Sequence, residues 1–116
     1  MRRMGRSPNE LWNELRREFK EQATSRGFEV RSPQPGAIVE ITYDKHLLTV
    51  LFDPKQHSVR CELPFHSARH RDRPNIVSVV LDPEEDPSFQ VDDEQVTAAQ
   101  AAASVLSTFA RQTSDE

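Results

Sequence analysis

The feature that most constrains the fold is a run from Ala37 to Leu81 in which apolar stretches alternate with short polar turns. Within the stretch from Ala37 to Tyr43, apolar and polar residues follow each other one by one, as in a strand with one buried face. The segments Asp44-Lys45 and Asp53-Pro54-Lys55-Gln56 have the composition of turns. The four strands that this run predicts are Ala37–Tyr43, His46–Phe52, Ser58–Phe65 and Asn75–Leu81.

The alternation also divides the side chains of these strands between two faces of the expected sheet. One face is expected to pack against helices and carries Val39, Ile41, Val50, Cys61, Leu63 and Val79. The opposite face keeps a second set of large apolar side chains among polar ones, namely Ile38, Leu47, Leu51, Ile76 and Val80.

Two of the predicted strands are apolar on both faces, and their positions in the sheet differ. This character places His46–Phe52 inside the sheet. A simple four-stranded meander leaves Asn75–Leu81 at an edge, where unpaired backbone groups invite pairing with another chain. A different strand order, or a chain terminus lying across the second face, would cover this surface instead.

A helix is expected to begin just after Ser7, because Ser7 and Glu10 have the spacing of a capping box and Pro8 suits the first helical position. Gly27 is expected to end it in a left-handed conformation, with Phe28 folding back onto the last turn near Ala23. The apolar stripe of this helix consists of Leu11, Trp12, Leu15, Phe19 and Ala23.

A second helix is expected to begin at Asp92, where Gln95 completes a capping box and Val91 can contact Val96 across the first turn. Residues from Arg111 onward are expected to fray. The apolar stripe of this helix is expected to consist of Val96, Ala99, Ala103, Leu106 and either Ala110 or Phe109.

These elements predict an α+β two-layer sandwich, a four-stranded antiparallel meander flanked by an N-terminal and a C-terminal helix. Phe28–Arg31 adds a short edge strand, which Ser32–Gly36 interrupts with two prolines and a glycine. The chain of 116 residues is the size of one domain. We expect this domain to cover residues 7–111, with flexible termini at 1–6 and 112–116.

The charge of the chain argues against a general nucleic-acid binder. The net charge is -4 and the pI is near 5.6, whereas binding phosphates requires clustered Lys and Arg. The single Cys61 excludes an intramolecular disulfide and fits a reducing compartment, so a cytoplasmic location is expected. No stretch approaches the ~18 consecutive apolar residues of a membrane span, and no membrane partner is expected.

A basic loop is the candidate anion site of the sequence. The segment His66–Arg73 holds Arg69, Arg71 and Arg73, which could bind phosphate or an acidic partner through charge-assisted hydrogen bonds. The competing interpretation is a solvated loop. Only Phe65 lies close enough to stack on a base, so nucleic-acid binding is the less favoured use of this loop.

The sequence predicts no metal site, no cofactor and no catalytic residue. Cys61, His66 and His70 could be taken as zinc ligands, but zinc needs a further ligand and Cys61 faces the core. A buried thiol is also a poor nucleophile. An enzyme would need a cleft that gathers His66, His70 and a carboxylate, and this hypothesis ranks third.

The favoured hypothesis is a small non-enzymatic protein-interaction module. It would self-associate, as a homodimer, or bind a protein partner through the open sheet face or the edge of the fourth strand. The alternative is binding of nucleic acid or an acidic partner through residues 66–73 and the N-terminal arginines.

Overall fold

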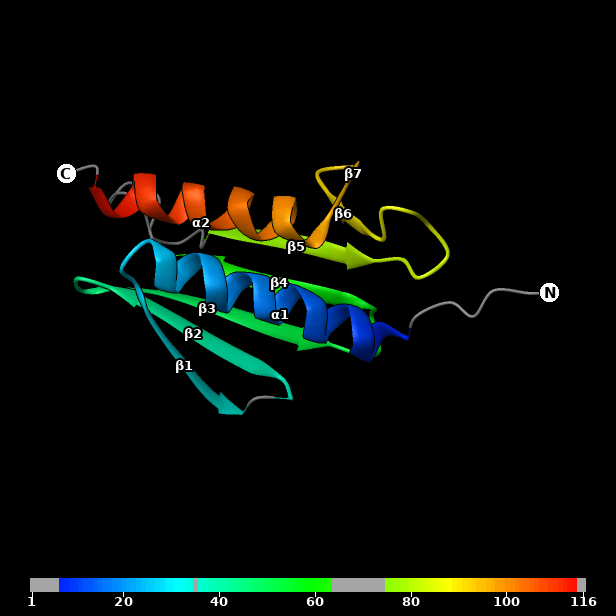
Figure 1. The fold of residues 1–116 in the computed structure, drawn as a ribbon, viewed down its shortest axis with the longest axis horizontal. Helices are drawn as coiled ribbons and strands as arrows, with labels where there is room; N and C mark the ends of the chain where they lie inside the picture. The colour runs from blue at the N-terminus through cyan, green and yellow to red at the C-terminus, as the bar shows by residue number, and fades with distance from the viewer. Residues whose placement is uncertain (1–6, 35, 64–74, 115–116) are drawn as a thin grey trace.

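The computed structural model describes residues 7–34, 36–63 and 75–114. In these residues the chain forms two helices and a seven-stranded antiparallel sheet whose strands stand in chain order, with both helices on one face of the sheet (Figure 1). The expected α+β meander with terminal helices is confirmed, but it has more strands than the four predicted. The elements are α1 (Pro8–Ser25), β1 (Glu29–Gln34), β2 (Ile38–Tyr43), β3 (His46–Asp53), β4 (Ser58–Leu63), β5 (Asn75–Leu81), β6 (Phe89–Val91), β7 (Glu94–Val96) and α2 (Ala98–Ser114).

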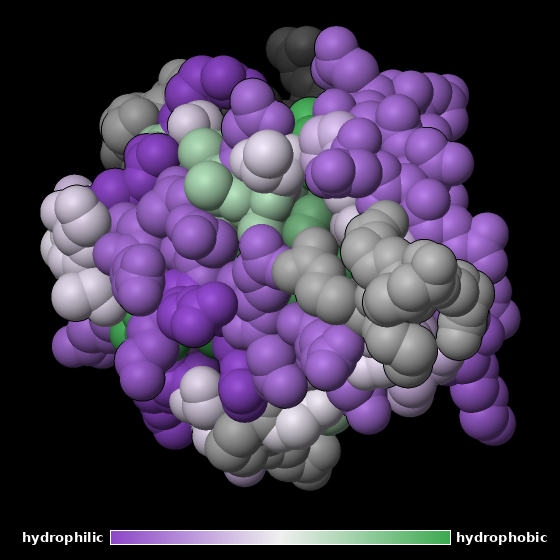
Figure 2. Space-filling view, turned by 45° about the vertical axis from the view of Figure 1, so that its right-hand side comes forward, coloured by the Kyte–Doolittle hydropathy of each residue, from purple (hydrophilic) through white to green (hydrophobic). Residues whose placement is uncertain are grey.

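Both ends of α1 form as the sequence predicts. The Glu10 backbone N–H donates to Ser7 Oγ at 3.2 Å, and the Ser7 N–H donates to Glu10 Oε1 at 2.9 Å. At the other end Gly27 has a φ of 85°, and the Phe28 N–H donates to the Ala23 carbonyl at 2.9 Å. The outer side of α1 is polar. The face of the molecule seen in Figure 2 is mostly hydrophilic.

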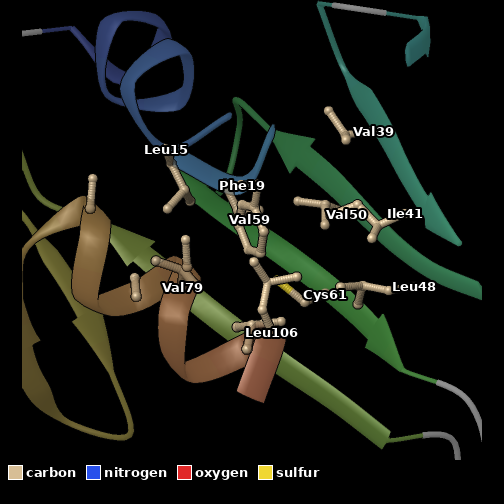
Figure 3. Close-up of a cluster of buried hydrophobic side chains, with 14 of the residues drawn as sticks. Leu15, Phe19, Val39, Ile41, Leu48, Val50, Val59, Cys61, Val79 and Leu106 are labelled. Carbon is tan, nitrogen blue, oxygen red and sulfur yellow. The ribbon is translucent and has the colours of Figure 1, made fainter. Parts of the chain in front are cut away.

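The core lies between the helices and the sheet face that they cover. All six side chains predicted to face the helices are buried, including Cys61. Figure 3 shows Leu15 and Phe19 of α1 and Leu106 of α2 directed toward the same region of β4 and β5. The two helices also contact each other, and the Gln22 side-chain amide donates to the Ala99 carbonyl at 3.0 Å.

The turns between the central strands are also confirmed. Asp44 has a φ of 60° and Tyr43 pairs with His46, so Asp44-Lys45 forms a two-residue hairpin turn. After β3, Asp53 Oδ1 accepts from the Lys55 N–H at 3.1 Å. These turns fix the register in which β3 lies between β2 and β4, as its two-sided apolar pattern indicates.

The predicted start of the second helix is wrong. Asp92 and Asp93 have φ values of 53° and 65° and form the turn between β6 and β7. Two adjacent residues with positive φ are what a type I′ hairpin needs, and aspartate tolerates this conformation better than most residues. The capping box is instead formed by Thr97 and Gln100, where the Gln100 N–H donates to Thr97 Oγ1 at 3.1 Å and the Thr97 N–H donates to Gln100 Oε1 at 2.9 Å.

The later start changes which side of α2 faces the core. Ala99, part of the predicted stripe, is exposed, and Ala103 is only half-buried. Ala98 and Ala102 take their places, because a helix that begins after Thr97 packs against β6 and α1 through a different stripe. The buried residues of α2 are Ala98, Ala101, Ala102, Val105, Leu106 and Phe109.

The predicted edge of the sheet is also wrong. β5 pairs with β4 on one side and, over Val79–Leu81, with β6 on the other, so the fourth predicted strand is not the edge strand. In the described part of the chain the two edges are β1 and β7. β1 continues past Arg31 to Gln34 through an irregularity in its register, and Pro33 is tolerated because it lies on an edge strand.

The β6–β7 turn supplies a test of its backbone conformation. Asp93→Gly should raise the free energy of unfolding by about 0.5–1 kcal/mol, because glycine adopts positive φ without the steric cost of a Cβ. Asp93→Ala should lower it, since alanine keeps the Cβ and loses the polar side chain. Urea unfolding of both variants checks this prediction, and equal stability of the two would contradict it.

Candidate interaction surface

The second face of the sheet is not covered by either helix, and we call it the bare face. It consists of the even-numbered side chains of β2, β4 and β5 and the odd-numbered side chains of β3. The predicted partner-binding residues lie here. The exposed fractions of Leu47, Ile76 and Val80 are 44%, 44% and 41%, while Ile38 and Leu51 are half-buried.

These three residues are most of the exposed large hydrophobics among the described residues. The remaining one is Tyr43. Its ring packs against that of Phe28, with the ring centroids 5.0 Å apart. By contrast, the surface seen in Figure 2 is mostly hydrophilic, with small hydrophobic spots between the polar side chains. The exposed apolar side chains are therefore concentrated on the bare face.

The register shows how the apolar residues are distributed on this face. Ile38 lies directly opposite Leu51, so these two form one apolar pair. The other three stand opposite polar partners, such as Thr42 for Leu47 and Ser58 for Val80. The bare face is therefore a mixture of apolar and polar positions rather than a continuous apolar strip.

The charges on the bare face are partly paired with each other. Arg60 Nη2 lies 2.9 Å from Glu62 Oε2, and both side chains are exposed. An exposed pair of this kind contributes only about 0.2–1 kcal/mol. In a contact between proteins, charges of this kind determine the choice of partner and the register more than the affinity.

A hollow of about 700 Å³ lies between α1 and the first two strands. Val30 and Val39 belong to its sheet side, and Arg17 and Lys20 belong to its helix side. Its described lining also includes Ser32 and the carboxylates of Glu10 and Glu14, and it contains no cysteine or histidine. It lies beside the sheet edge that β1 forms.

Of the remaining candidates from the sequence, Cys61 lies among the described residues. Cys61 is fully buried, and burial raises the pKa of its thiol to about 12, so it is neither a nucleophile nor a metal ligand in the folded chain. His66, His70 and the predicted anion-binding residues Arg69, Arg71 and Arg73 lie outside the described residues. Over residues 7–34, 36–63 and 75–114 no cluster of ligands suited to a metal ion occurs.

Comparisons with protein-family models, with curated proteins and with solved structures found no match to this chain. Neither α1 nor α2 is long and apolar enough to cross a membrane, as judged from the described residues. What the chain can bind must therefore be inferred from its own residues.

The sequence does not point to the full length of the edge strand β1. The composition at Ser32 and Pro33 indicates a break, although proline and charged residues are common on edge strands. Glu29 and Arg31, two residues apart on an exposed strand, are the feature that could have identified it.

Proposed function

We propose that this chain is a small protein-interaction module that self-associates through the bare face of its sheet. The observation that carries this proposal is the one-sided sheet, in which Leu47, Ile76 and Val80 remain exposed on the face opposite the helices. The edge of β5 is less suited to this contact than the bare face, because β6 already pairs with it over Val79–Leu81.

A second copy suits this face for two reasons. Exposed apolar side chains gain free energy when they leave water, at about 25 cal/mol per Å² of buried apolar area. The polar positions between them, including Thr49 and Ser78, offer short side chains that can form hydrogen bonds across a contact. A surface of this mixed kind favours reversible rather than obligate association.

Val80→Glu tests the proposal directly. It places a charge on the exposed side of β5 and, at low protein concentration, should shift the protein from about twice the 13.3 kDa of one chain to the mass of one chain. The reason is that an unpaired carboxylate in a contact costs far more than one in water. Gel filtration with light scattering measures the mass.

Ser104→Glu is the matched control, because Ser104 is exposed on α2, on the opposite side of the molecule. It should leave the mass unchanged. A wild-type chain that is monomeric at every concentration, with a Val80→Glu variant of full stability, would rule the proposal out. Binding through Arg69, Arg71 and Arg73 stays a prediction, since no described residue bears on it.

A further inference from the structure

The hydrogen-bond pattern of the sheet determines which backbone groups of β1 point outward. The Phe52 N–H donates to the Ala37 carbonyl at 2.8 Å, and the register places these two residues opposite each other. Along a strand in an antiparallel sheet, successive residues direct their backbone N–H and C=O groups alternately toward the neighbouring strand on one side and the neighbouring strand on the other. The odd-numbered residues just before and within β2 therefore bond to β3, and the even-numbered residues face β1.

The same reasoning extends to β1. Glu29 lies opposite Thr42 and Arg31 lies opposite Glu40, so the backbone groups of Glu29 and Arg31 face β2. Val30, between them, must direct its N–H and C=O away from the sheet. No other strand among the described residues pairs with this side of β1, which lies at the border of the sheet in Figure 1.

The side chains next to Val30 have opposite charges. If two copies of β1 pair antiparallel with Val30 opposite Val30, each Glu29 lies opposite an Arg31 of the other copy. Oppositely charged residues directly across a strand pair stabilise it, and this register repeats the contact twice. Both side chains are exposed, so they are accessible to a second copy.

We infer that β1 is a homotypic docking edge whose occupant is β1 of a second copy of this chain, paired about Val30. Two backbone hydrogen bonds between the Val30 residues and two Glu29–Arg31 pairs hold the contact. Pro33, which has no N–H, limits the paired segment to the first part of β1.

This contact extends the proposed function without using the same surface. Antiparallel pairing about Val30 places the two-fold axis perpendicular to the sheet, so two sheets of seven strands become one continuous sheet. The bare faces of both copies then lie on the same side. Edge pairing therefore doubles the bare-face area available for face-to-face association, and in this one respect it rests on the proposed function.

A disulfide tests the register. In the double variant Glu29→Cys/Arg31→Cys, each introduced thiol lies opposite its partner in a pair that exchanges no backbone bonds, where the Cα atoms are about 4.5 Å apart and within disulfide range. Mild oxidation should give a covalent dimer on a non-reducing gel. Cys61 does not compete, because it is buried.

The single variant Glu29→Cys is the matched control. Its two introduced thiols, one at position 29 of each copy, would be separated by two residues along the strands. This is about 7 Å in addition to the spacing between strands, which is too far for a disulfide. The single variant should remain uncrosslinked. Equal crosslinking of the single and double variants, or none in either, would overturn the inference.

A charge exchange tests how much the Glu29–Arg31 pairs contribute to the edge contact. It is made in the Val80→Glu background, in which the bare-face contact is removed. The protein concentration is chosen high enough for the edge contact to form by itself. Glu29→Arg should weaken the remaining dimer by about tenfold or more, since two attractive pairs become repulsive. The exchange Glu29→Arg/Arg31→Glu should restore the affinity of the Val80→Glu background. Sedimentation velocity over a range of concentrations measures both.

The two proposals fail in different ways in these experiments. If the edge contact is wrong, Glu29→Arg leaves self-association unchanged, while Val80→Glu abolishes it at every concentration. If the bare-face contact is wrong, Val80→Glu has no effect and the double cysteine variant still crosslinks. Far-UV circular dichroism of each variant confirms that the fold is retained, which is expected because Glu29 and Arg31 are exposed.

Discussion

Trp12→Ala is expected to lower the free energy of unfolding by about 3–5 kcal/mol, the range observed when a buried aromatic side chain is truncated. Trp12 is 2% exposed and stacks on Phe52, with ring centroids 5.3 Å apart and an interplanar angle of 5°. The contact joins α1 to β3, so its loss affects both layers of the sandwich. A domain of this size is stabilised by only about 5–15 kcal/mol, and urea unfolding followed by circular dichroism should show a much lower midpoint.

Trp12→Phe is the matched control for this experiment. Phenylalanine keeps a ring that can pack against Phe52, and it removes the indole N–H, which is buried without a hydrogen-bond partner among the described residues. Burying an unsatisfied donor costs about 1–3 kcal/mol, so its removal offsets part of the lost packing. The Phe variant should therefore lose much less stability than the Ala variant. Equal losses would show that stacking and burial at this position are not the cause.

The stability of the folded chain should fall in alkaline solution because of Cys61. Burial raises the pKa of this thiol from 9.0 to about 12, so the folded state retains a proton that the unfolded state loses. A raised pKa of this kind contributes stability that is fully present below about pH 9 and is lost as the pH rises toward about 12. Between these limits the free energy of unfolding should decrease by about 1.4 kcal/mol per pH unit.

The measurement compares this slope with that of Cys61→Ala. The variant keeps all other titrating groups, so any slope that remains belongs to them. Urea unfolding at several values between about pH 8 and pH 11 should show a steeper decline for the wild type. Identical slopes would mean that the thiol titrates equally in both states, and the burial argument would then be wrong.

The sequence predicts the centre of the sheet well because several local features agree there. The turns at Asp44-Lys45 and after Asp53 fix the register, and alternation then assigns each side chain to a face. The burial of Cys61 follows directly from this alternation. The capping box at Ser7 and the glycine at position 27 define α1 for the same reason, since each end has a feature of its own.

The wrong predictions occur where the same residue type is common in two kinds of local structure. Aspartate is common both at helix N-caps and at hairpin positions with positive φ, so the pattern at Asp92 predicts a helix where the chain forms a hairpin. The three-residue strands β6 and β7 are too short for alternation to be decisive, and only the pairing of β6 with β5 and of β7 with β6 reveals them. The position of the sheet edge depends on that pairing, so it does not follow from the sequence pattern alone.

The sequence predicts which residues lie on the bare face, but not which of them stand next to each other across the strands. Alternation identifies Leu47 and Val80 as members of one face, yet it does not say which residues stand opposite each other. The register places Thr42 and Ser58 beside them and thereby interrupts what looks in the sequence like an apolar surface.

The position of α2 at the end of the described chain affects the order in which the core can form. Each strand pairs with its neighbour in sequence, so the sheet can grow by local steps that cost little loop entropy. The core is complete only when α2 arrives, because Leu106 and Phe109 cover it from that helix. During synthesis the apolar face above β5 and β6 therefore stays open to water until the last helix has been made. We expect this interval, rather than the finished fold, to be the time at which the chain is most prone to aggregate.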